Sequence, residues 1–192
     1  MFRVPTKERR VYLTFDDGPV PEVTPKVLDL LDEMNVKATF FMVGDNARRY
    51  PELVEEVTRR GHDVGNHTMH HLQGIKVTTR RYLRDIEEAD RLLHTPYFRP
   101  PHGFLRPLQA LALRRSHRLV MYDLVTRDYS DRLTAEDVKE NVRRLARPGS
   151  IIVFHDSLKS LPRLFDALPE CIGWLRDNGY SFARLSDYYS LK

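Results

Sequence analysis

The feature that most constrains the fold is a repeated alternation of short apolar segments with longer segments of helical periodicity. The short segments are strand-like, because they are rich in β-branched and aromatic residues and end at glycine, proline or polar residues. The longer segments place apolar residues at helical spacing, so that one side of each helix is apolar. The predicted strands are 11–15, 37–44, 63–66, 97–99, 119–122, 150–154 and 180–183, and the predicted helices are 24–34, 51–60, 79–93, 107–115, 134–146 and 161–177. Seven strands alternating with six helices indicate parallel βαβ units, in a barrel or a doubly wound sheet.

Length and composition favour one soluble globular domain over residues 1–192. Hydrophobic residues make up 41% of the chain and charged residues 30%, values that are close to the average for such domains. The net charge of +4 comes from basic residues that are scattered over several predicted helices beside acidic ones, which is a poor match to a nucleic-acid interface. The single cysteine, Cys171, excludes an intrachain disulfide and is expected to pack in a helix.

No segment approaches the apolar length of a membrane span, and the first residues lack the hydrophobic core of a secretory signal. We therefore expect a protein without a membrane span. Its place would be the cytoplasm, or the cell envelope if a leader is missing from this chain.

Reactive side chains follow the predicted strands, at the point where each strand ends. These are Asp16 and Asp17, the segment 67–71, Arg99, the segment 123–128, and His155. In a parallel barrel the carboxyl ends of the strands open on one common face, which is where such folds place their chemistry. The sequence therefore predicts an active site at that face.

A metal site is predicted from the segment 67–71. It offers three imidazoles, from His67, His70 and His71, at a spacing that lets two rings share one ion. One carboxylate from the adjacent pair Asp16 and Asp17 would complete a set of two histidines and one aspartate. Such a set leaves a coordination position open, as in a catalytic zinc-type site. The spacing alone leaves open which histidines and which aspartate bind.

Five segments resemble, in order, the motifs of the polysaccharide deacetylases, which are carbohydrate esterase family 4 or the NodB homology domain. They are 14–18 (TFDDG), 61–71 (GHDVGNHTMHH), 98–103 (FRPPHG), 128–129 (DY) and 153–156 (VFHD). The resemblance covers about residues 11–188. It implies a distorted (β/α)7 barrel and a divalent metal, often zinc, that serves to remove acetyl groups from N-acetylated or O-acetylated sugars.

The resemblance also implies the metal ligands and the base. Asp17, His67 and His71 would hold the ion, which we expect to be Zn²⁺, with Co²⁺ or another divalent ion as an alternative. Asp16 would be the free carboxylate that acts as general base on the attacking water. This division of roles agrees with the chemistry of metal-assisted hydrolysis.

The remaining roles follow from the same resemblance. His155 would be the general acid that protonates the departing amine, and the backbone N–H of His102 would stabilise the oxyanion. Arg99 would orient Asp16. Asp128 would orient His155 and stabilise its charge.

This chain departs from the family motifs in three places. His102 stands where the family usually has tyrosine, Tyr129 where it has tryptophan and Val153 where it has leucine. These changes alter the walls beside the substrate and leave every residue with a direct catalytic role in place. His70 competes with His71 as a ligand.

The sequence favours a metal-dependent deacetylase acting on N-acetylated amino sugars of a peptidoglycan-like or chitin-like glycan, and a monomer. One alternative keeps the fold and the metal and acts on O-acetyl esters of xylan, or on a small amide or formamide. Another is an inactive module that binds glycans. A third, a basic nucleic-acid binder, would lose affinity steeply with salt.

Overall fold

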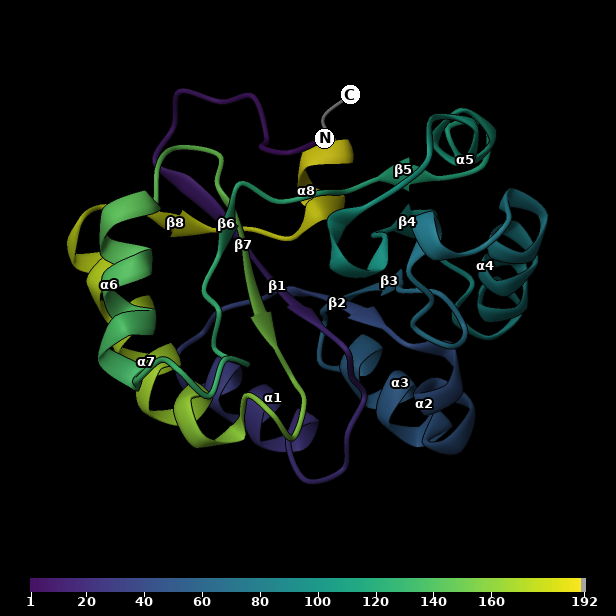
Figure 1. The fold of residues 1–192 in the computed structure, drawn as a ribbon. Helices are drawn as coiled ribbons and strands as arrows, with labels where there is room; N and C mark the ends of the chain where they lie inside the picture. The colour runs from purple at the N-terminus through teal and green to yellow at the C-terminus, as the bar shows by residue number, and fades with distance from the viewer. Residues whose placement is uncertain (191–192) are drawn as a thin grey trace.

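A curved sheet of parallel strands forms the centre of the computed structural model, which describes residues 1–190 (Figure 1). The strands are β1 (Arg10–Asp16), β2 (Thr39–Met42), β3 (Asp63–Asn66), β4 (Tyr97–Phe98), β5 (Arg118–Leu119), β6 (Leu124–Val125), β7 (Ile151–His155) and β8 (Ser181–Phe182). Seven of them follow the order β5-β4-β3-β2-β1-β7-β6, and β8 pairs with the start of β1. Within the described residues the end strands β5 and β6 do not pair with each other, so the barrel is distorted and open. The predicted α/β barrel class is confirmed.

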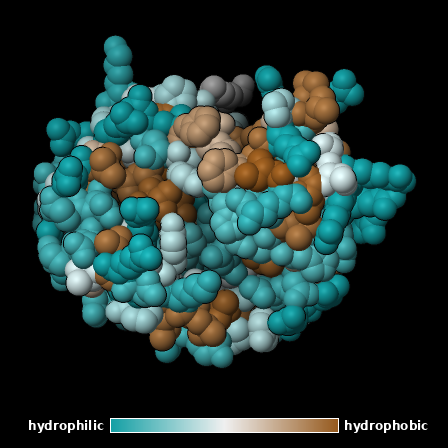
Figure 2. Space-filling view, in the orientation of Figure 1, coloured by the Kyte–Doolittle hydropathy of each residue, from teal (hydrophilic) through white to brown (hydrophobic). Residues whose placement is uncertain are grey.

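Helices cover the outside of this sheet. They are α1 (Thr24–Glu33), α2 (Gly44–Arg49), α3 (Pro51–Arg59), α4 (Thr79–Leu93), α5 (Pro107–Leu113), α6 (Ala135–Leu145), α7 (Leu161–Asp177) and α8 (Leu185–Tyr189), with short 3₁₀ turns η1 (Gly74–Lys76) and η2 (Pro101–Gly103). In Figure 1, α1, α2 and α3 lie along the lower side, α6 and α7 on the left, and α4 and α5 on the right. Hydrophilic residues predominate on the surface over α6 and α4 (Figure 2). None of the helices in the described part of the chain is both long and apolar enough to cross a membrane.

A layer of stacked aromatic rings in the core aligns the strands that carry the site. The ring of Phe15 in β1 stacks on Phe40 of β2 at 4.9 Å and on Phe154 of β7 at 6.0 Å, and all three are fully buried. Burying each such side chain stabilises the fold by about 1.5–3 kcal/mol. The three rings are also partners in strand register, so the next residues, Asp16 and His155, lie opposite each other at the carboxyl ends. The hydrophobic core therefore places two predicted site residues side by side.

The prediction of one strand over 119–122 is wrong in extent. The chain forms two separate two-residue strands, β5 and β6, and two-residue strands carry too little periodicity to be recognised. Because β6 lies between Asp123 and Asp128, these two acids are at opposite ends of the sheet. Asp123 accepts hydrogen bonds from the backbone N–H of Ile151 (3.0 Å) and from Arg147 (3.1 Å), at the start of β7. The expectation that Asp123 belongs to the active-site face is therefore wrong.

Two short helices, α2 and α8, were not predicted. Gly44 was expected to end a strand, whereas it begins α2, where a Cβ would lie 2.5 Å from the sulfur of Met69. This close contact explains the glycine by packing rather than by chain termination. One side chain of α2 then matters for the site, because the amide of Asn46 donates to the backbone oxygen of Asp17 at 2.9 Å.

His62 is a structural histidine of the core. Only 4% of its surface is exposed, its Nδ1 accepts the backbone N–H of Ala38 at 3.1 Å, and its ring meets the edge of Phe40. Burial, together with the nearby charge of Lys37, lowers the pKa of His62 to about 4. The folded state therefore contains His62 in its neutral form.

We expect His62→Gln to reduce the acid sensitivity of the fold. In the unfolded chain His62 takes up a proton near its ordinary pKa of 6.5, but in the folded protein it does so only near pH 4. Stability is therefore present above pH 6.5 and is lost as pH falls toward 4, by about 1.4 kcal/mol per pH unit of separation. Glutamine can accept the same backbone hydrogen bond without titrating. Denaturant unfolding at several pH values measures the effect, and parallel pH curves for both proteins would contradict it.

Candidate active site at the carboxyl ends of the strands

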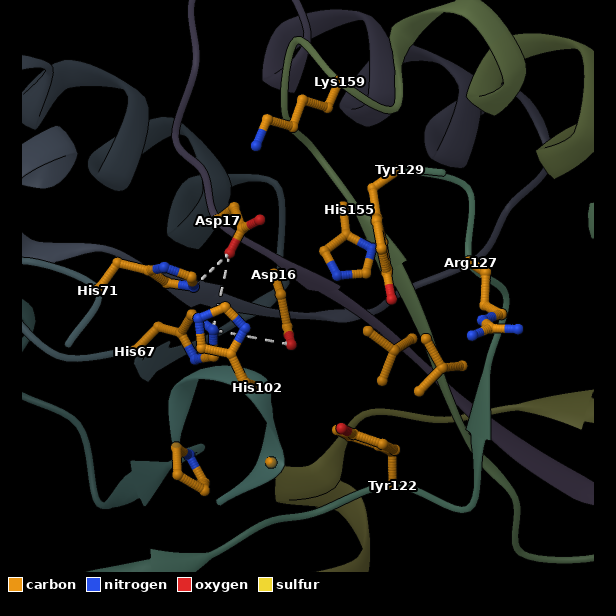
Figure 3. A pocket seen from close by; sticks show the side chains of 14 residues that line it. Asp16, Asp17, His67, His71, His102, Tyr122, Arg127, Tyr129, His155 and Lys159 are labelled. Carbon is orange, nitrogen blue, oxygen red and sulfur yellow. Dashed lines mark ion pairs between the residues drawn. The ribbon is translucent and has the colours of Figure 1, made fainter. Parts of the chain in front are cut away.

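A pocket of about 450 Å³ opens at the carboxyl ends of the strands (Figure 3). Its walls come from the carboxyl ends of β1, β6 and β7 and from the segments that follow β1, β3, β4, β5, β6 and β7. The lining residues are Asp16, Asp17, His67, His71, Pro100, His102, Gly103, Tyr122, Val125, Arg127, Tyr129, Val153, His155 and Lys159. Six of the predicted site residues, which lie far apart in sequence, thus meet in one place.

Asp17, His67 and His71 form a cluster of possible metal ligands, and their donor atoms all lie within 4.8 Å of one another. The Nε2 atoms of His67 and His71 are 3.7 Å and 3.1 Å from Oδ1 of Asp17. Burial raises the pKa of Asp17, but the hydrogen bond from His71 and the nearby histidine charges outweigh it, and the pKa lies well below its usual range. The carboxylate is therefore ionised, as a metal ligand must be.

The state of His67 also fits a metal ligand. Its Nδ1 lies 2.8 Å from the backbone oxygen of Arg99, which can only accept, so Nδ1 carries the proton and Nε2 presents a lone pair to the cluster. Burial lowers the pKa of His67 to about 4, so the ring is neutral at pH 7. A neutral imidazole oriented by a carbonyl oxygen is the usual condition of a metal-binding histidine. The donor set of this cluster therefore suits a divalent ion such as zinc.

His70 lies outside this cluster. Its Nδ1 is 2.6 Å from Oδ1 of Asp85, and its backbone N–H donates to the same carboxylate at 3.1 Å. Asp85 belongs to α4, so this contact connects the histidine segment to a helix. The tertiary structure thus resolves which histidines of the segment face Asp17.

Asp16 is held beside the cluster by Arg99. The guanidinium donates from Nη1 to Oδ1 of Asp16 at 2.6 Å and to the hydroxyl of Thr14 at 2.7 Å, and it lies 4.1 Å over the ring of Phe41. Arg99 is fully buried, and its burial lowers its pKa. The other carboxylate oxygen of Asp16 is 4.0 Å from Nε2 of His67. One oxygen is thus fixed by Arg99 while the other is directed toward the cluster.

His155 is held by Asp128. The carboxylate accepts from the backbone N–H of His155 at 2.8 Å and lies 2.7 Å from its Nδ1. Burial would lower the pKa of His155, but the hydrogen bond and charge of Asp128 outweigh it and raise the pKa to about 9. The imidazole is therefore protonated at neutral pH, and it faces the pocket beside the ring of Tyr129 (Figure 3).

Asp156 holds the loop that carries the two aspartates. This buried carboxylate accepts the backbone N–H of Gly18 at 3.1 Å and the hydroxyl of Thr24 at 2.7 Å. A Cβ on Gly18 would overlap the Asp156 side chain, so only glycine allows this approach. The loop that follows β1 is thereby held on β7.

All three departures from the family motifs line the pocket. His102 lies in η2 with a φ of 60°, and its ring meets that of His71 edge-on at 5.0 Å. Tyr129 packs against His155, with ring centroids 4.8 Å apart, and Val153 lies in β7. The substitutions change the wall of the pocket beside the residues described above.

The sequence did not single out Tyr122, Val125, Arg127 or Lys159 as site residues, although Val125 and Arg127 lie in the segment 123–128 that was expected at this face. Three of these flank or belong to β6, the strand that was not recognised. Lys159 follows β7 in a loop whose position at the carboxyl end was predicted. The rule that loops after parallel strands line the site would have identified Lys159 from the sequence.

A family model described as polysaccharide deacetylase matches residues 3–119. Two Bacillus cereus proteins described as peptidoglycan-N-acetylglucosamine deacetylases are 35% and 32% identical to this chain. The first alignment covers 98% of this chain and 71% of that protein, and the second covers 100% and 93%. The crystal structure of the Bc1960 peptidoglycan N-acetylglucosamine deacetylase is similar with a TM-score of 0.92 and 34% identity, over 97% of this chain and 91% of that one. The chain therefore belongs to the polysaccharide deacetylase family, carbohydrate esterase family 4.

The same fold also occurs in a Bacillus anthracis protein described as a pseudoenzyme of this family, with a TM-score of 0.87 and 22% identity. The fold alone therefore does not establish activity, which depends on the residues of the pocket.

Proposed function

We propose that this protein is a metal-dependent hydrolase that removes N-acetyl groups from amino sugars in a peptidoglycan-like glycan. One observation carries the proposal. A cluster of three possible metal ligands, a carboxylate held outside it and a protonated imidazole all line the same pocket. Metal-assisted hydrolysis of an amide uses these three elements together: an ion, a general base and a general acid.

Asp17, His67 and His71 would hold the ion, and Zn²⁺ suits two neutral imidazoles and one carboxylate. When bound, the ion would supply Lewis-acid chemistry, which polarises the acetyl carbonyl and acidifies water. The proposed ligands come from the loops after β1 and β3, the two strands that flank β2 in the sheet.

Asp16 would act as the general base. Arg99 fixes one oxygen of its carboxylate at 2.6 Å, and the other oxygen is free to take the proton of a water that attacks the acetyl carbon. Arg99 would thus be a positioning residue. The backbone N–H of His102, in the turn η2 at the pocket wall, would donate to the oxyanion that forms.

His155 would act as the general acid. The sugar nitrogen is a poor leaving group unless it is protonated, and an imidazolium with a raised pKa can provide that proton. Asp128 keeps the ring oriented through Nδ1, so that Nε2 carries the proton toward the pocket. Proton removal by Asp16 and proton delivery by His155 would then complete the hydrolysis.

The substrate class is proposed from the named relatives and from the chemistry of the site. We expect acetate release from peptidoglycan fragments, at a higher rate with added Zn²⁺ or Co²⁺ and at a much lower rate with a chelator. Chitooligosaccharides and acetylated xylan are the comparison substrates, and release from xylan alone would favour the O-acetyl esterase. Saturable oligosaccharide binding without acetate release from any substrate would instead identify an inactive glycan-binding module and refute the proposal.

A further inference from the structure

Asp85 is a buried carboxylate of α4 that no catalytic step proposed above uses. Only 7% of its surface is exposed, and its ion-pair partner within residues 1–190 is the imidazole of His70. A buried carboxylate is costly to retain unless hydrogen-bond donors surround it. Each hydrogen bond that the described structure gives the Asp85 side chain comes from the histidine segment 67–71. The Asp85 carboxylate therefore holds that segment.

Two successive backbone N–H groups of the segment point at one oxygen of Asp85. Oδ2 accepts the N–H of Met69 at 2.9 Å and the N–H of His70 at 3.1 Å, while Oδ1 lies 2.6 Å from Nδ1 of His70. Hydrogen bonds to an ionised acceptor are stronger than those between neutral groups. The peptide groups on either side of Met69 are therefore fixed by α4.

The same two peptide groups are bound on their other side by α2. The N–H groups of Gly44 and Asp45 donate to the backbone oxygens of Thr68 and Met69, at 2.9 Å in both cases. The carbonyl and the N–H of each peptide are thus held by two different helices, α2 and α4, and this fixes the orientation of the peptide plane. Without the Asp85 side chain the carbonyl contacts would remain, but the planes could tilt.

The histidine segment has an irregular backbone that needs such contacts. Thr68 has a φ of 67° and His71 a φ of 53°, both in the left-handed region that residues other than glycine seldom adopt. These two residues flank the pair of N–H groups bound by Asp85. A backbone of this kind persists where the surrounding contacts impose it, and it is common at functional sites. As a result the His71 ring is turned to Asp17, with Nε2 3.1 Å from Oδ1 (Figure 3).

His67 is held by different contacts. Its backbone N–H donates to the oxygen of Met42 at 2.9 Å, and its Nδ1 lies 2.8 Å from the backbone oxygen of Arg99. The contacts of Asp85 come after His67 in the chain and directly before His71. Loss of the Asp85 carboxylate should therefore release His71 and leave His67 in place.

We propose that Asp85 is a positioning residue of the metal site, which holds the peptide groups before His71 so that this ring is presented to the ion. The affinity of the site for a divalent metal then depends on a carboxylate of helix α4 that does not itself touch the ion. Partners behind metal ligands commonly change metal affinity by roughly 10–100-fold. This inference rests on the ligand set of the proposed function and adds the residue that orients one of its ligands.

The test measures metal binding, with Co²⁺ as the probe. Calorimetry gives the affinity of the metal-free protein for Co²⁺, and the visible absorption spectrum reports the geometry around the bound ion. We expect Asp85→Ala to bind Co²⁺ roughly 10–100-fold more weakly than the natural protein and to change the spectrum. Asp85→Asn keeps an oxygen that can accept the two N–H groups, so it should restore most of the affinity.

Asp123→Ala is the matched control. The side chains of Asp123 and Asp85 are both 7% exposed, and Asp123 also accepts a backbone N–H, that of Ile151 at 3.0 Å, but at the opposite end of the sheet. We expect Asp123→Ala to lose stability in denaturant unfolding and to keep the Co²⁺ affinity and spectrum of the natural protein. A weaker site in Asp85→Ala alone would then have a cause other than general destabilisation.

Asp85→Ala keeps two anchors of the histidine segment. The backbone oxygen of Asp85 also accepts the N–H of Met69 at 3.2 Å, and the Met69 side chain is fully buried. A second measurement needs no variant. In the metal-free natural protein the amides of Met69 and His70 should exchange hydrogen slowly, because they are bound before the ion arrives. Rapid exchange at both amides would overturn the proposal.

Equal Co²⁺ affinity and equal spectra for Asp85→Ala and the natural protein would also overturn it, and so would an equal loss of affinity in Asp123→Ala. Weaker binding by Asp85→Ala that is restored in Asp85→Asn would support it. A natural protein that binds neither Co²⁺ nor Zn²⁺ would instead count against the proposed function. The exchange of the Met69 and His70 amides would then still decide whether Asp85 holds the segment.

Discussion

Asp17→Asn and His71→Gln are each expected to lower acetate release by about a thousandfold, because loss of the ion removes several kcal/mol of transition-state stabilisation. Both side chains belong to the cluster whose donor atoms lie within 4.8 Å of one another. Zinc content, measured after dialysis, should fall together with activity. Exposure of the natural protein to a strong chelator should produce the same loss, and added Zn²⁺ should reverse the loss only in the natural protein.

His70→Gln is the matched control for this prediction. His70 belongs to the same histidine segment, but its ring binds Asp85 of α4 at 2.6 Å and does not face Asp17. We expect this variant to keep its zinc and most of its activity. Loss of zinc in His70→Gln with full zinc in His71→Gln would show that the ligand set proposed here is wrong.

His155→Ala is expected to slow the hydrolysis of an N-acetyl amide by about 10²–10⁴-fold, which is the usual contribution of a positioned general acid. The loss on an O-acetyl ester of similar shape should be much smaller, because an alkoxide departs more easily than an amide nitrogen. The ratio of the two losses therefore tests the acid role separately from substrate binding. Equal losses on amide and ester would assign His155 a structural or binding role.

The pH dependence of amide hydrolysis also tests the acid role of His155. A general acid must be protonated, and the pKa of His155 is raised to about 9 by the hydrogen bond and charge of Asp128, which outweigh burial. Amide hydrolysis should therefore decline as pH rises through about 9. In Asp128→Asn the ring loses the charge that holds its proton, so the decline should begin at lower pH. If amide hydrolysis by this variant declined over the same pH range as in the natural protein, the role given to Asp128 would be contradicted.

Several elements could be predicted from the sequence because their signals are local. β1 and β7 contain short apolar runs rich in β-branched and aromatic residues, which are typical of buried strands, and the helices from α1 to α7 that exceed six residues carry clear helical periodicity. The short strand β6 and the helices α2 and α8 carry too few residues to show a period. Asp123 was misplaced for that reason, since the end of the sheet to which it belongs depends on a strand of two residues.

For the candidate site, as for the fold, the sequence determined some features and the tertiary structure decided the others. The sequence by itself determined which residue types occur at the strand ends, and with them the chemistry of two imidazoles, two carboxylates and a further histidine, because a motif is a property of neighbouring residues. The spacing left His70 and His71 open and the family resemblance favoured His71, and the tertiary structure shows that His71 faces Asp17 while His70 binds Asp85. Only the tertiary structure decided that Arg127 and Lys159 line the same pocket. The physical reason is that side-chain direction depends on what packs behind each loop. Here Asp85 of α4 binds His70, and the buried neighbours of Arg127 fix its backbone, which are contacts between residues distant in sequence.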